Sequence, residues 1–520
     1  MEIEPPGRFA KLWQVYWKAG TAHQAQRASR KLVESGIGFD EAHAGLARGR
    51  PYGGKVRRGL SRKARVGRGG LQHLYAVVVP EDYSSETSYP VTFYLHGGVL
   101  RPAPSRSDTW WPGALVDSAT SEIVVIPAGW SESLWWQAHQ VENLANILDR
   151  LKRTYNIDEN RVSLMGVSDG GTGAYFQAFR ATTQWASFLS FIGHSRVLGS
   201  DSINADGDMF AVNLSNKPWF VVNTGNDRLY PSYVVVPYLE LFESVGTEIV
   251  FRHQPDFGHD LRWWPNEEDR INRFIENHPR NPLPDRIVWE TERVDRYNRA
   301  HWVVIDELGP VPGESDLPGL NSISVIPRGP SLGISPDPQS TTGIVVNAVQ
   351  TGSLAARAGV EPGDVIMAVA GAPTPNLSRL AEEVSKMAAW ESAIPLSLER
   401  AGESLEIVVY TPPAPPAQPP IQAFPRSGQS GRVEVSRKGN KITVRSAGVR
   451  TFRLLLSPDQ FDFDRQLQVD TNGVTSFRGT IAPSVGTLFK WAAIDNDRTM
   501  LFGAELEVQV AVGKGSLVGP

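Results

Sequence analysis

A serine flanked by glycines is the residue of this sequence best placed to do chemistry. Gly166-Val-Ser168-Asp-Gly170 follows the apolar run 161–167, and a second apolar segment begins at Thr172. This order predicts a strand, a tight turn and a helix, with the serine presented at the strand tip and the glycines leaving room for the close passage. Because the chain has 48 glycines, such a pattern also arises by chance. The hypothesis of a nucleophile therefore depends on partners for the serine.

A base and an acid follow Ser168 along the chain. A serine hydroxyl becomes a useful nucleophile when a base removes its proton and a carboxylate orients that base. Asp227 follows the apolar strand predicted at 219–223, and His259 lies in the loop after the next strand, 249–253. Since parallel strands bring their carboxyl ends to one edge of a sheet, the three side chains are predicted to meet there.

Other assignments of these partners stay open in the sequence. Asp227 is also placed to cap the segment that follows it, in which case Asp256 or Asp260 supplies the acid. A single Gly-His pair such as that of His259 is more often structural than catalytic. His253, near the end of its strand, is expected to pack. The combination of several elements in the right order favours a serine hydrolase.

Two backbone N–H groups are needed to stabilise the oxyanion of acyl transfer. Asp169, directly after the serine, is expected to supply one of them. The turn His96-Gly97-Gly98 follows the apolar strand predicted at 91–95, and Gly97 or Gly98 is expected to supply the other. We expect His96 to hold this turn in place rather than to take part in the chemistry.

Composition limits the partners, cofactors and compartments that can be expected for this chain. The chain has 520 residues, a formal net charge of −4 and no run apolar enough to span a bilayer, so neither nucleic acid nor membrane is expected as a partner. It has no cysteine, which excludes disulfides and thiolate nucleophiles. His139 and Glu142 share a helix face without further ligands, so no metal and no cofactor are expected. Met1–Arg8 does not resemble a signal peptide, so the compartment is left open: the periplasm or the extracellular space if a leader has been removed, and otherwise the cytoplasm. The oligomeric state is left open.

Alternating strands and helices predict an α/β class with a mainly parallel sheet covered on both faces. A helix is expected at 138–155, and the basic run 55–68 is expected to be a solvated loop. The predicted apolar strands are 74–79, 91–95, 123–126, 162–167, 188–192, 219–223 and 249–253.

Composition also divides the chain into regions. The predicted regions are an N-terminal helical region (1–70), a catalytic domain (71–280), strands with a linker (281–330), a distinct block (331–411) and a C-terminal domain (421–520). The proline-rich stretch 411–420 is typical of an extended linker. Residues 431–512 show a strand pattern throughout, which predicts a β-sandwich, and the strands at 286–306 are expected to pair with it. The block 331–411 would then be an insertion.

The catalytic region resembles the α/β-hydrolase family, and within it the secreted bacterial esterases and peptidases related to polyhydroxybutyrate depolymerases and feruloyl esterases. The resemblance covers about 70–280 and is carried by four segments: Leu95-His-Gly-Gly, Tyr155-Asn-Ile-Asp-Glu-Asn-Arg-Val-Ser-Leu-Met-Gly-Val-Ser-Asp-Gly-Gly-Thr-Gly, Thr224-Gly-Asn-Asp and Gly258-His-Asp. It implies hydrolysis of carboxylic esters or peptides through an acyl-enzyme on Ser168, with His259 as the general base and acid and Asp227 orienting it. The N-terminal helices are not part of that family fold.

The block 331–411 resembles a PDZ domain. The resemblance is carried by Ser331-Leu-Gly-Ile334 and by Ala355-Ala-Arg-Ala-Gly-Val-Glu-Pro-Gly-Asp-Val-Ile. It implies that the N–H groups of Leu332, Gly333 and Ile334 capture a peptide C-terminus, with the helix expected at 377–389 as the other groove wall. The alternative is a PDZ fold used only for packing.

Three tryptophan pairs follow segments that leave the catalytic edge of the sheet. As amphipathic aromatics they are expected to form a hydrophobic substrate wall, the alternative being that they anchor their loops in the core. The six residues are Trp110, Trp111, Trp135, Trp136, Trp263 and Trp264.

Ester and peptide hydrolysis use the same three side chains, so the motifs do not separate them. A carboxylesterase acting on small-molecule or polymeric esters, with aryl or short-chain acyl groups, is favoured because no segment predicts a propeller that gates polypeptides. The alternatives are a serine peptidase whose PDZ domain binds polypeptide C-termini, and a PDZ scaffold without catalysis.

Overall fold

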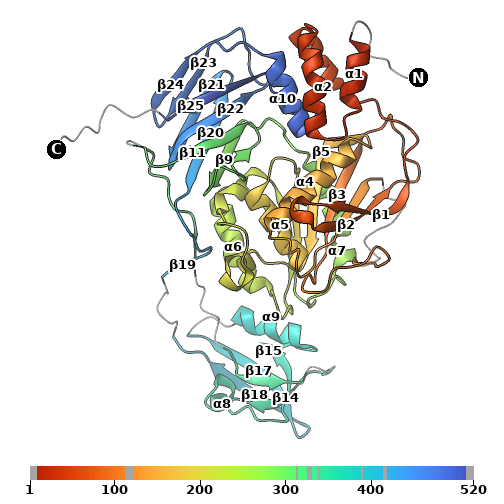
Figure 1. Cartoon of the computed structure of the whole chain (residues 1–520). Coiled ribbons are helices and arrows are strands. Elements are labelled where there is room, and N and C mark those ends of the chain that lie inside the picture. The colour runs from red at the N-terminus through yellow and green to blue at the C-terminus, as the bar shows by residue number, and fades with distance from the viewer. Residues whose placement is uncertain are drawn as a thin grey trace, which may run out of the picture.

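Five groups of buried apolar side chains organise the part of the chain that the computed structural model describes. The described residues are 9–111, 121–311, 314–324, 331–337, 340, 342–387, 391–413 and 419–510. Two of these cores lie on the faces of one large sheet, and the others belong to the N-terminal helices, to two smaller sheets and to an inserted lobe (Figure 1). Parts of the predicted regions 1–70, 281–330 and 421–520, and of the linker 411–420, lie outside the described residues.

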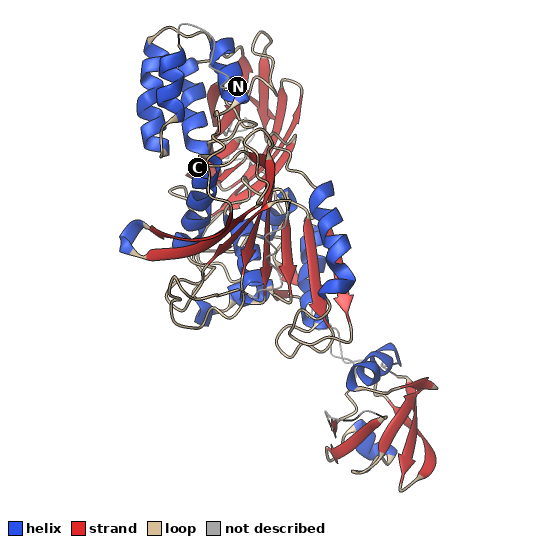
Figure 2. Ribbon diagram, turned by 90° about the vertical axis from the view of Figure 1, so that its right-hand side faces the viewer, coloured by secondary structure: helices blue, strands red, loops and turns tan. Residues whose placement is uncertain are grey.

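An eight-stranded mixed sheet forms the centre of the molecule (Figure 2). Its strands are β1 (Gly59–Val66), β2 (Gln72–Val79), β3 (Tyr89–Leu95), β4 (Ile123–Pro127), β5 (Ile157–Val167), β6 (Phe188–Phe191), β7 (Trp219–Thr224) and β8 (Ile249–Gln254). The spatial order is β1-β2-β4-β3-β5-β6-β7-β8. Neighbouring strands pair in parallel from β4 to β8, as predicted. In contrast, β2 pairs antiparallel with β4 on one side and with β1 on the other. Along β2, Tyr75 and Val77 belong to one core and Leu74 and Ala76 to the other, so the sheet is buried on both faces.

Helices cover both faces of this sheet. Leu144 of α4 (Ala138–Lys152), Phe176 of α5 (Asp169–Arg180) and Leu239 of α6 (Ser232–Ser244) share the core that contains Val77. Phe274 of α7 (Trp264–Asn277) belongs to the opposite core. The helix predicted at 138–155 ends three residues earlier than expected.

The basic run at 55–68 is not the loop that its charges predicted, because residues 59–66 form β1. This strand pairs along its whole length with β2 at the edge of the sheet. Lys63 extends over the ring of Tyr155, and Arg58 donates to the carbonyls of Glu81 and Tyr83. Charged side chains suit an edge strand, since they discourage pairing with another chain.

The N-terminal helices pack on a helix from the C-terminal end of the described chain. Side chains of α1 (Ala10–Trp17), α2 (Ala22–Glu34) and α3 (Phe39–Arg48) share one core with α10 (Val485–Asp495). The prediction of strands throughout 431–512 is therefore wrong at α10. Ser484 caps this helix, and Leu488 and Phe489 face the N-terminal helices.

Strands from both sides of the insertion pair with one another. They are β9 (Arg286–Thr291), β10 (Arg299–Ala300), β11 (Val303–Leu308), β20 (Gly431–Lys438), β21 (Lys441–Ala447), β22 (Val449–Leu456), β23 (Leu467–Thr471), β24 (Val474–Gly479) and β25 (Ala504–Gln509). One sheet has the order β24-β23-β21-β20-β9 and the other β10-β11-β22-β25. The two sheets contribute to one apolar core, so the strands at 286–308 need the chain that follows the insertion to complete it.

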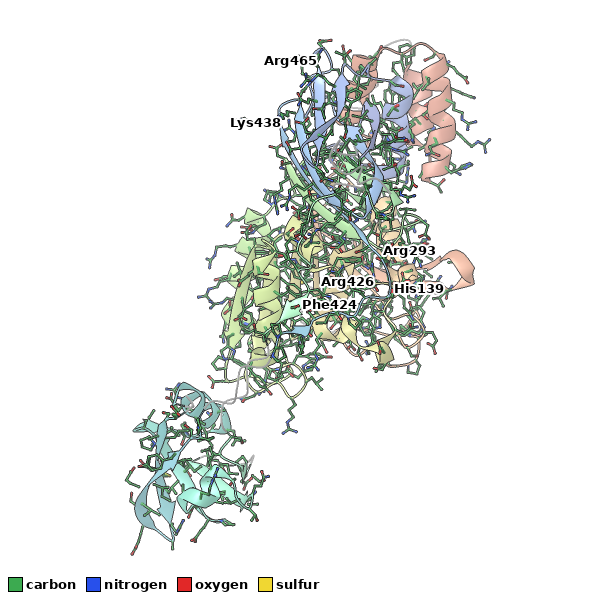
Figure 3. All side chains as sticks on the ribbon, turned by 90° about the vertical axis from the view of Figure 1, so that its left-hand side faces the viewer. His139, Arg293, Phe424, Arg426, Lys438 and Arg465 are labelled. Atoms are coloured by element: carbon green, nitrogen blue, oxygen red, sulfur yellow. The ribbon has the colours of Figure 1, made fainter. Side chains whose placement is uncertain are left out.

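The insertion forms a separate lobe with its own core (Figures 2 and 3). Its elements are β13 (Ile334–Pro336), β14 (Ile344–Val349), α8 (Leu354–Ala358), β15 (Val365–Val369), β16 (Ala372–Pro373), α9 (Leu377–Met387), β17 (Ala393–Arg400) and β18 (Glu403–Tyr410). Two short strands, β12 (Ser322–Ile323) and β19 (Ile421–Gln422), pair where the chain leaves for the lobe and returns. Phe424, just after the return, is fully buried between Phe179 and Tyr238. The two chain segments that lead to and from the lobe are thus held together by the β12–β19 pairing and anchored in the core by Phe424.

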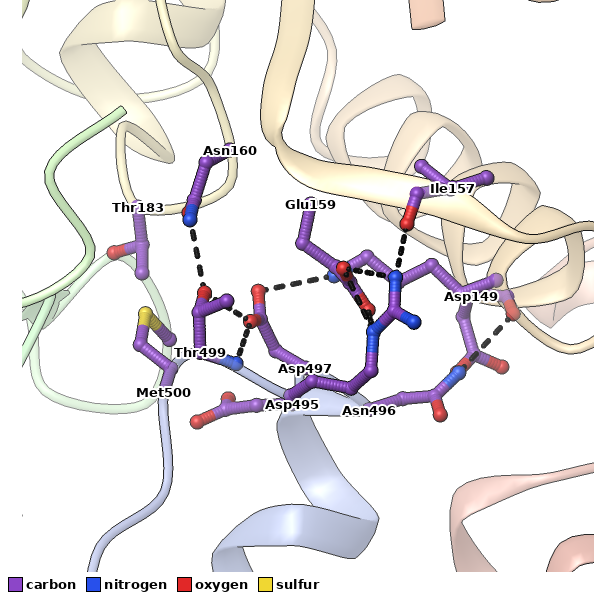
Figure 4. Close-up of polar contacts among 12 residues, drawn as sticks. Asp149, Ile157, Glu159, Asn160, Thr183, Asp495, Asn496, Asp497, Thr499 and Met500 are labelled. Atoms are coloured by element: carbon purple, nitrogen blue, oxygen red, sulfur yellow. Dashed lines mark hydrogen bonds and ion pairs between the residues drawn. The ribbon is translucent and has the colours of Figure 1, made fainter. Parts of the chain in front are cut away.

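A buried polar network joins the region of the large sheet to the C-terminal region (Figure 4). Asp497 accepts hydrogen bonds from Arg280 at 2.8 Å and from Lys152 at 3.2 Å, and all three side chains are at most 4% exposed. Next to it, Arg498 donates to Glu159 and to the carbonyl of Ile157 at the start of β5. Although burial alone raises the pKa of Asp497, the charges of Arg280 and Lys152 outweigh it and hold that pKa far below its usual range.

We expect Asp497→Asn to lower the free energy of unfolding by about 3–5 kcal/mol, because it leaves two buried cations without their carboxylate. The measurement is urea unfolding followed by tryptophan fluorescence. In the native protein the contribution of this carboxylate is present above the ordinary aspartate pKa near 4 and is lost as the pH falls below it. Asp295→Asn removes the exposed half of a surface pair with Arg293 and should change the free energy of unfolding far less. Equal losses in the two variants would contradict the prediction.

Candidate functional site

Ser168 lies in a strained turn between β5 and α5. Its backbone has φ 55° and ψ −118°, an angle pair that residues with side chains rarely adopt. A Cβ on Gly166 would lie 2.0 Å from the carbonyl oxygen of Gly170, and a Cβ on Gly170 would lie 1.9 Å from that of Leu95. The prediction that these glycines let strand and helix pass closely is confirmed.

The structure brings Ser168, His259 and Asp227 into one line of hydrogen bonds. The Oγ atom of Ser168 lies 2.8 Å from Nε2 of His259, and Nδ1 of His259 lies 2.7 Å from Oδ2 of Asp227. The acid is buried, whereas the His259 side chain is 26% exposed. With Nδ1 bonded to a carboxylate, the proton of a neutral imidazole sits on Nδ1, and Nε2 is free to accept the serine proton.

Asp227 holds the turn that precedes α6 and is a partner of His259 at the same time; α6 itself begins after Pro231, without a side-chain cap. Its Oδ1 accepts from the N–H groups of Leu229 at 2.7 Å and Tyr230 at 3.0 Å, while Oδ2 faces the imidazole. Burial by itself raises the pKa of Asp227, but the hydrogen bonds from His259 and from these two N–H groups more than offset it, so the pKa is lowered. The carboxylate therefore stays charged at neutral pH.

The alternative acids are not bonded to His259 in this arrangement. Asp260 forms a two-oxygen pair with the exposed guanidinium of Arg262, which lowers the pKa of that carboxyl, and Asp256 is exposed. His253, expected to pack, is instead exposed and bonded to Ser232.

The glycine turn after β3 lies directly against the serine. A Cβ on Gly97 would come within 2.9 Å of the Cβ of Ser168, and Gly98 has a positive φ of 65°. His96 is buried, with Nε2 accepting from the N–H of Gly129 at 2.9 Å and Nδ1 lying 2.8 Å from the carbonyl of Gly97. Burial lowers the pKa of His96 to about 4, so the ring is neutral and holds the turn, as predicted.

Five of the six paired tryptophans pack in the cores, which corrects the expected substrate wall. Trp135 is fully buried and donates from its indole to the carbonyl of His96, and Trp110 donates to that of Ile126. Their rings pack in the apolar cores, and the buried N–H groups of these two indoles find acceptors there. The buried five are Trp110, Trp111, Trp135, Trp136 and Trp263, and Trp264 is half-buried.

Other apolar side chains, close in sequence to the glycine turn and to Asp227, are exposed, and the sequence patterns did not indicate them. Leu100 follows the glycine turn and is 80% exposed, and Leu229, two residues after Asp227, is 60% exposed. Tyr233, at the start of α6, is 55% exposed, and the ring of Tyr230 lies 5.8 Å from that of His259. Their nearness in sequence to the turn and to the acid is the signal that could have found them.

Neither a metal cluster nor a membrane helix is found where the chain is described. His139 is bonded to Ser133, and no three His, Asp or Glu side chains in the described ranges are grouped so as to hold a metal ion. Within the same ranges, no helix combines the length and apolar character needed to cross a bilayer.

The turn predicted to bind a peptide carboxylate lies at the edge of the inserted sheet. Leu332 is buried in the core of the lobe, Gly333 has φ 74° with its Cβ position only 2.3 Å from the Cβ of Ser353, and Ile334 begins the edge strand β13. The carbonyls of Leu332 and Gly333 accept from the N–H groups of Ala355 and Gln350. The predicted groove helix is α9, and its residues 388–389 lie outside the described chain.

Comparison with known proteins identifies the inserted lobe. Residues 345–389 match the family model of the PDZ domain. The chain carries a PDZ domain. This match lies within the lobe and does not include the large sheet.

Part of the chain is similar to known hydrolases. It is 29% identical over 157 residues to the bifunctional acetylxylan esterase/xylanase XynS20E of Neocallimastix patriciarum, which is 30% of this chain and 22% of that protein. Among solved structures, it is similar to a thermostable esterase (19% identity, 42% of this chain and 63% of that one, TM-score 0.35). A ferulic acid esterase (18%, 43% and 99%, TM-score 0.33) and the acylaminoacyl peptidase of Pyrococcus horikoshii (14%, 43% and 42%, TM-score 0.35) are further examples.

We expect Gly170→Ala to lower the free energy of unfolding by about 3 kcal/mol, or to prevent soluble expression, because the added methyl overlaps the carbonyl of Leu95. Thermal unfolding monitored by circular dichroism measures the change. Gly53→Ala is the matched control, since a Cβ there meets nothing within 4 Å and its φ is not positive. If the Gly170→Ala variant is as stable as the Gly53→Ala variant, the close passage of β5 and α5 is not required.

Proposed function

We propose that the protein is a serine carboxylic-ester hydrolase that works through an acyl-enzyme on Ser168. The observation that carries the proposal is the line from Ser168 through His259 to the buried carboxylate of Asp227, with bonds of 2.8 and 2.7 Å. Such a line is the arrangement by which a serine hydroxyl becomes a nucleophile. The similarity to an acetylxylan esterase supports the same chemistry.

In the proposed reaction, Ser168 attacks the ester carbonyl while His259 takes the hydroxyl proton. The imidazolium then gives this proton to the leaving alcohol, and a water molecule, activated by the same imidazole, releases the acid and restores the serine. Asp227, charged at neutral pH, stabilises the imidazolium in each half of the cycle.

The oxyanion is proposed to be bound by the N–H of Asp169 and by that of Gly98 or Gly97. The N–H of Asp169 is the first of α5, where the helix itself offers no acceptor. Because a trans peptide points its C=O and N–H in opposite directions, a Gly97 carbonyl bonded to His96 aims the N–H of Gly98 away from that ring. This favours Gly98 over Gly97 as the second donor.

Exposed apolar side chains close in sequence to the glycine turn and to the acid support esters with aryl or short acyl groups as substrates. Leu100 follows the glycine turn in the sequence, and Leu229 and Tyr233 follow Asp227 by two and six residues. Ser168 itself is only half-buried, so the reacting end of a polymer-bound ester could reach it as well as a small ester.

We expect wild-type protein to hydrolyse p-nitrophenyl acetate and butyrate, and Ser168→Ala to lose about 10⁴-fold or more in kcat, because the nucleophile is gone. A panel of chromogenic peptides is run beside the esters. Turnover of peptides without esters would favour the peptidase alternative, and ester turnover that survives Ser168→Ala would exclude the mechanism.

The same assay checks the acid. Asp227→Asn should lower kcat by about 10⁴-fold, since the amide favours the wrong imidazole tautomer. Asp260→Asn, whose carboxylate is bonded to Arg262, should stay within a few-fold of wild type. A large loss for Asp260→Asn, with none for Asp227→Asn, would move the acid to the other residue.

The PDZ match supports a second function, the binding of a polypeptide C-terminus at Leu332, Gly333 and Ile334. β13 is an edge strand, so a peptide can add to it as a further strand. Because the carbonyls of Leu332 and Gly333 are bonded within their own lobe, the N–H groups of Gly333 and Ile334 point to the opposite side of the same peptides, where that of Gly333 donates to Oγ of Ser331 at 3.2 Å. A bound carboxylate is proposed to lie on that side.

We expect fluorescein-labelled peptides with a free C-terminal carboxylate to bind, and the same peptides with a C-terminal amide to bind at least about tenfold more weakly, as a charge-assisted hydrogen bond is lost. Fluorescence polarisation over a library of last residues measures this. The control replaces 325–418 by a short Gly-Ser linker between the paired strands β12 and β19, and it should lose binding while keeping ester hydrolysis. Equal binding of acid and amide would exclude carboxylate capture.

A further inference from the structure

We propose that the side chain of Asp169 is a positioning residue: its carboxylate fastens the glycine turn 97–99 to the serine elbow, so that the two donors of the oxyanion site are held as one unit. This inference rests on the proposed acyl transfer at Ser168. It assigns a task to the carboxylate, in addition to the backbone N–H of the same residue.

The contact that carries the inference joins two segments 70 residues apart in sequence. The N–H of Val99 donates to Oδ2 of Asp169 at 3.0 Å. Val99 is fully buried, so its N–H needs an acceptor inside the protein. Asp169 is the first residue of α5, and Gly170 behind it is already pressed against the carbonyl of Leu95. The backbone that carries the Asp169 side chain is thus held in place next to the glycine turn.

The turn needs such a tie because its own backbone is permissive. It contains two consecutive glycines, and Gly98 is exposed with a positive φ. His96 holds the carbonyl of Gly97, and Arg101 donates to the carbonyl of Trp110, so these contacts fix the near end of the turn and the chain beyond it. The bond from Val99 to Asp169 fixes the far end, on the side of the nucleophile.

A second observation shows why a carboxylate in this place calls for an explanation. Burial, followed by the charges of Asp169 and Asp227, raises the pKa of Tyr230 to about 12, and the ring of Tyr230 packs against His259. The charge of Asp169 therefore reaches the site. A negative charge there opposes a developing oxyanion, so Asp169 is costly unless its oxygen is needed as an acceptor.

Two substitutions separate the charge of Asp169 from its acceptor oxygen. Asp169→Asn removes the charge but keeps an oxygen that can accept from Val99, whereas Asp169→Ala removes both. We expect Asp169→Ala to lower kcat for p-nitrophenyl butyrate by about 10²-fold with KM within about threefold, the pattern of a lost transition-state interaction. Asp169→Asn should stay within about fivefold of wild type. Asp40→Ala, which removes an acid from the first turn of α3, is the matched control and should leave the kinetics unchanged.

Two further readouts separate positioning from general damage. Affinity for an alkyl boronic acid, which forms a tetrahedral adduct on the serine, should fall with kcat in Asp169→Ala and recover in Asp169→Asn. Hydrogen exchange at the peptide containing Val99 should accelerate in Asp169→Ala, remain slow in Asp169→Asn, and show no change in Asp40→Ala. Exchange does not require turnover, so it tests the tie even if the wild-type protein hydrolyses no ester and the proposed function fails.

The inference is overturned if Asp169→Ala keeps both the kcat of wild type and its slow exchange at Val99. It is also overturned if Asp169→Asn is as impaired as Asp169→Ala in both measurements, since the acceptor oxygen would then not be the feature that matters. A lowered melting temperature with unchanged kcat and unchanged boronic-acid affinity would assign Asp169 to stability alone.

Discussion

The contact between the backbone of Gly170 and the carbonyl of Leu95 is the constraint on which the rest of the site depends. It brings α5 onto the ends of β3 and β5, and it forces Ser168 into a conformation with positive φ. A helix so close to the strand ends places its first N–H and the hydroxyl of Ser168 at one edge of the sheet. The glycine turn after β3 is drawn to the same edge, where it meets Asp169.

A position as strained as that of Ser168 persists only if its surroundings over-determine it. Here the surroundings are the parallel strands on both sides of β5 and a core of large aromatic side chains, including most of the paired tryptophans. At the opposite end of β5, the network around Asp497 holds the start of the strand to the C-terminal region. Both ends of the strand that carries the serine are therefore anchored, one by apolar packing and one by paired charges.

The tryptophans illustrate where reasoning from the sequence reached its limit. Their positions after strand ends indicated the catalytic edge, but a residue at that edge can point toward solvent or back into the core. The structure turns most of them inward, where their rings join the two apolar cores on the faces of the sheet, and Trp135 and Trp110 also find acceptors in the carbonyls of His96 and Ile126. Likewise, the many charges of residues 59–66 predicted a loop, but these residues form β1 because they pair with β2. The local strand propensity of residues 485–495 predicted a strand, but they form α10, which packs against α2.

Short-range patterns sufficed for the strand–turn–helix at Ser168, for the glycines that permit it and for the lobe at 331–411, since each depends on residues close together in the chain. The order of the motifs favoured Asp227 as the acid but left Asp256 and Asp260 open, and the tertiary structure decided which carboxylate is bonded to His259. All three lie in loops near the same edge, and only three-dimensional packing sets which carboxylate faces Nδ1 of His259. The tie between Asp169 and Val99 belongs to the same kind, because a hydrogen bond across 70 residues has no local signature.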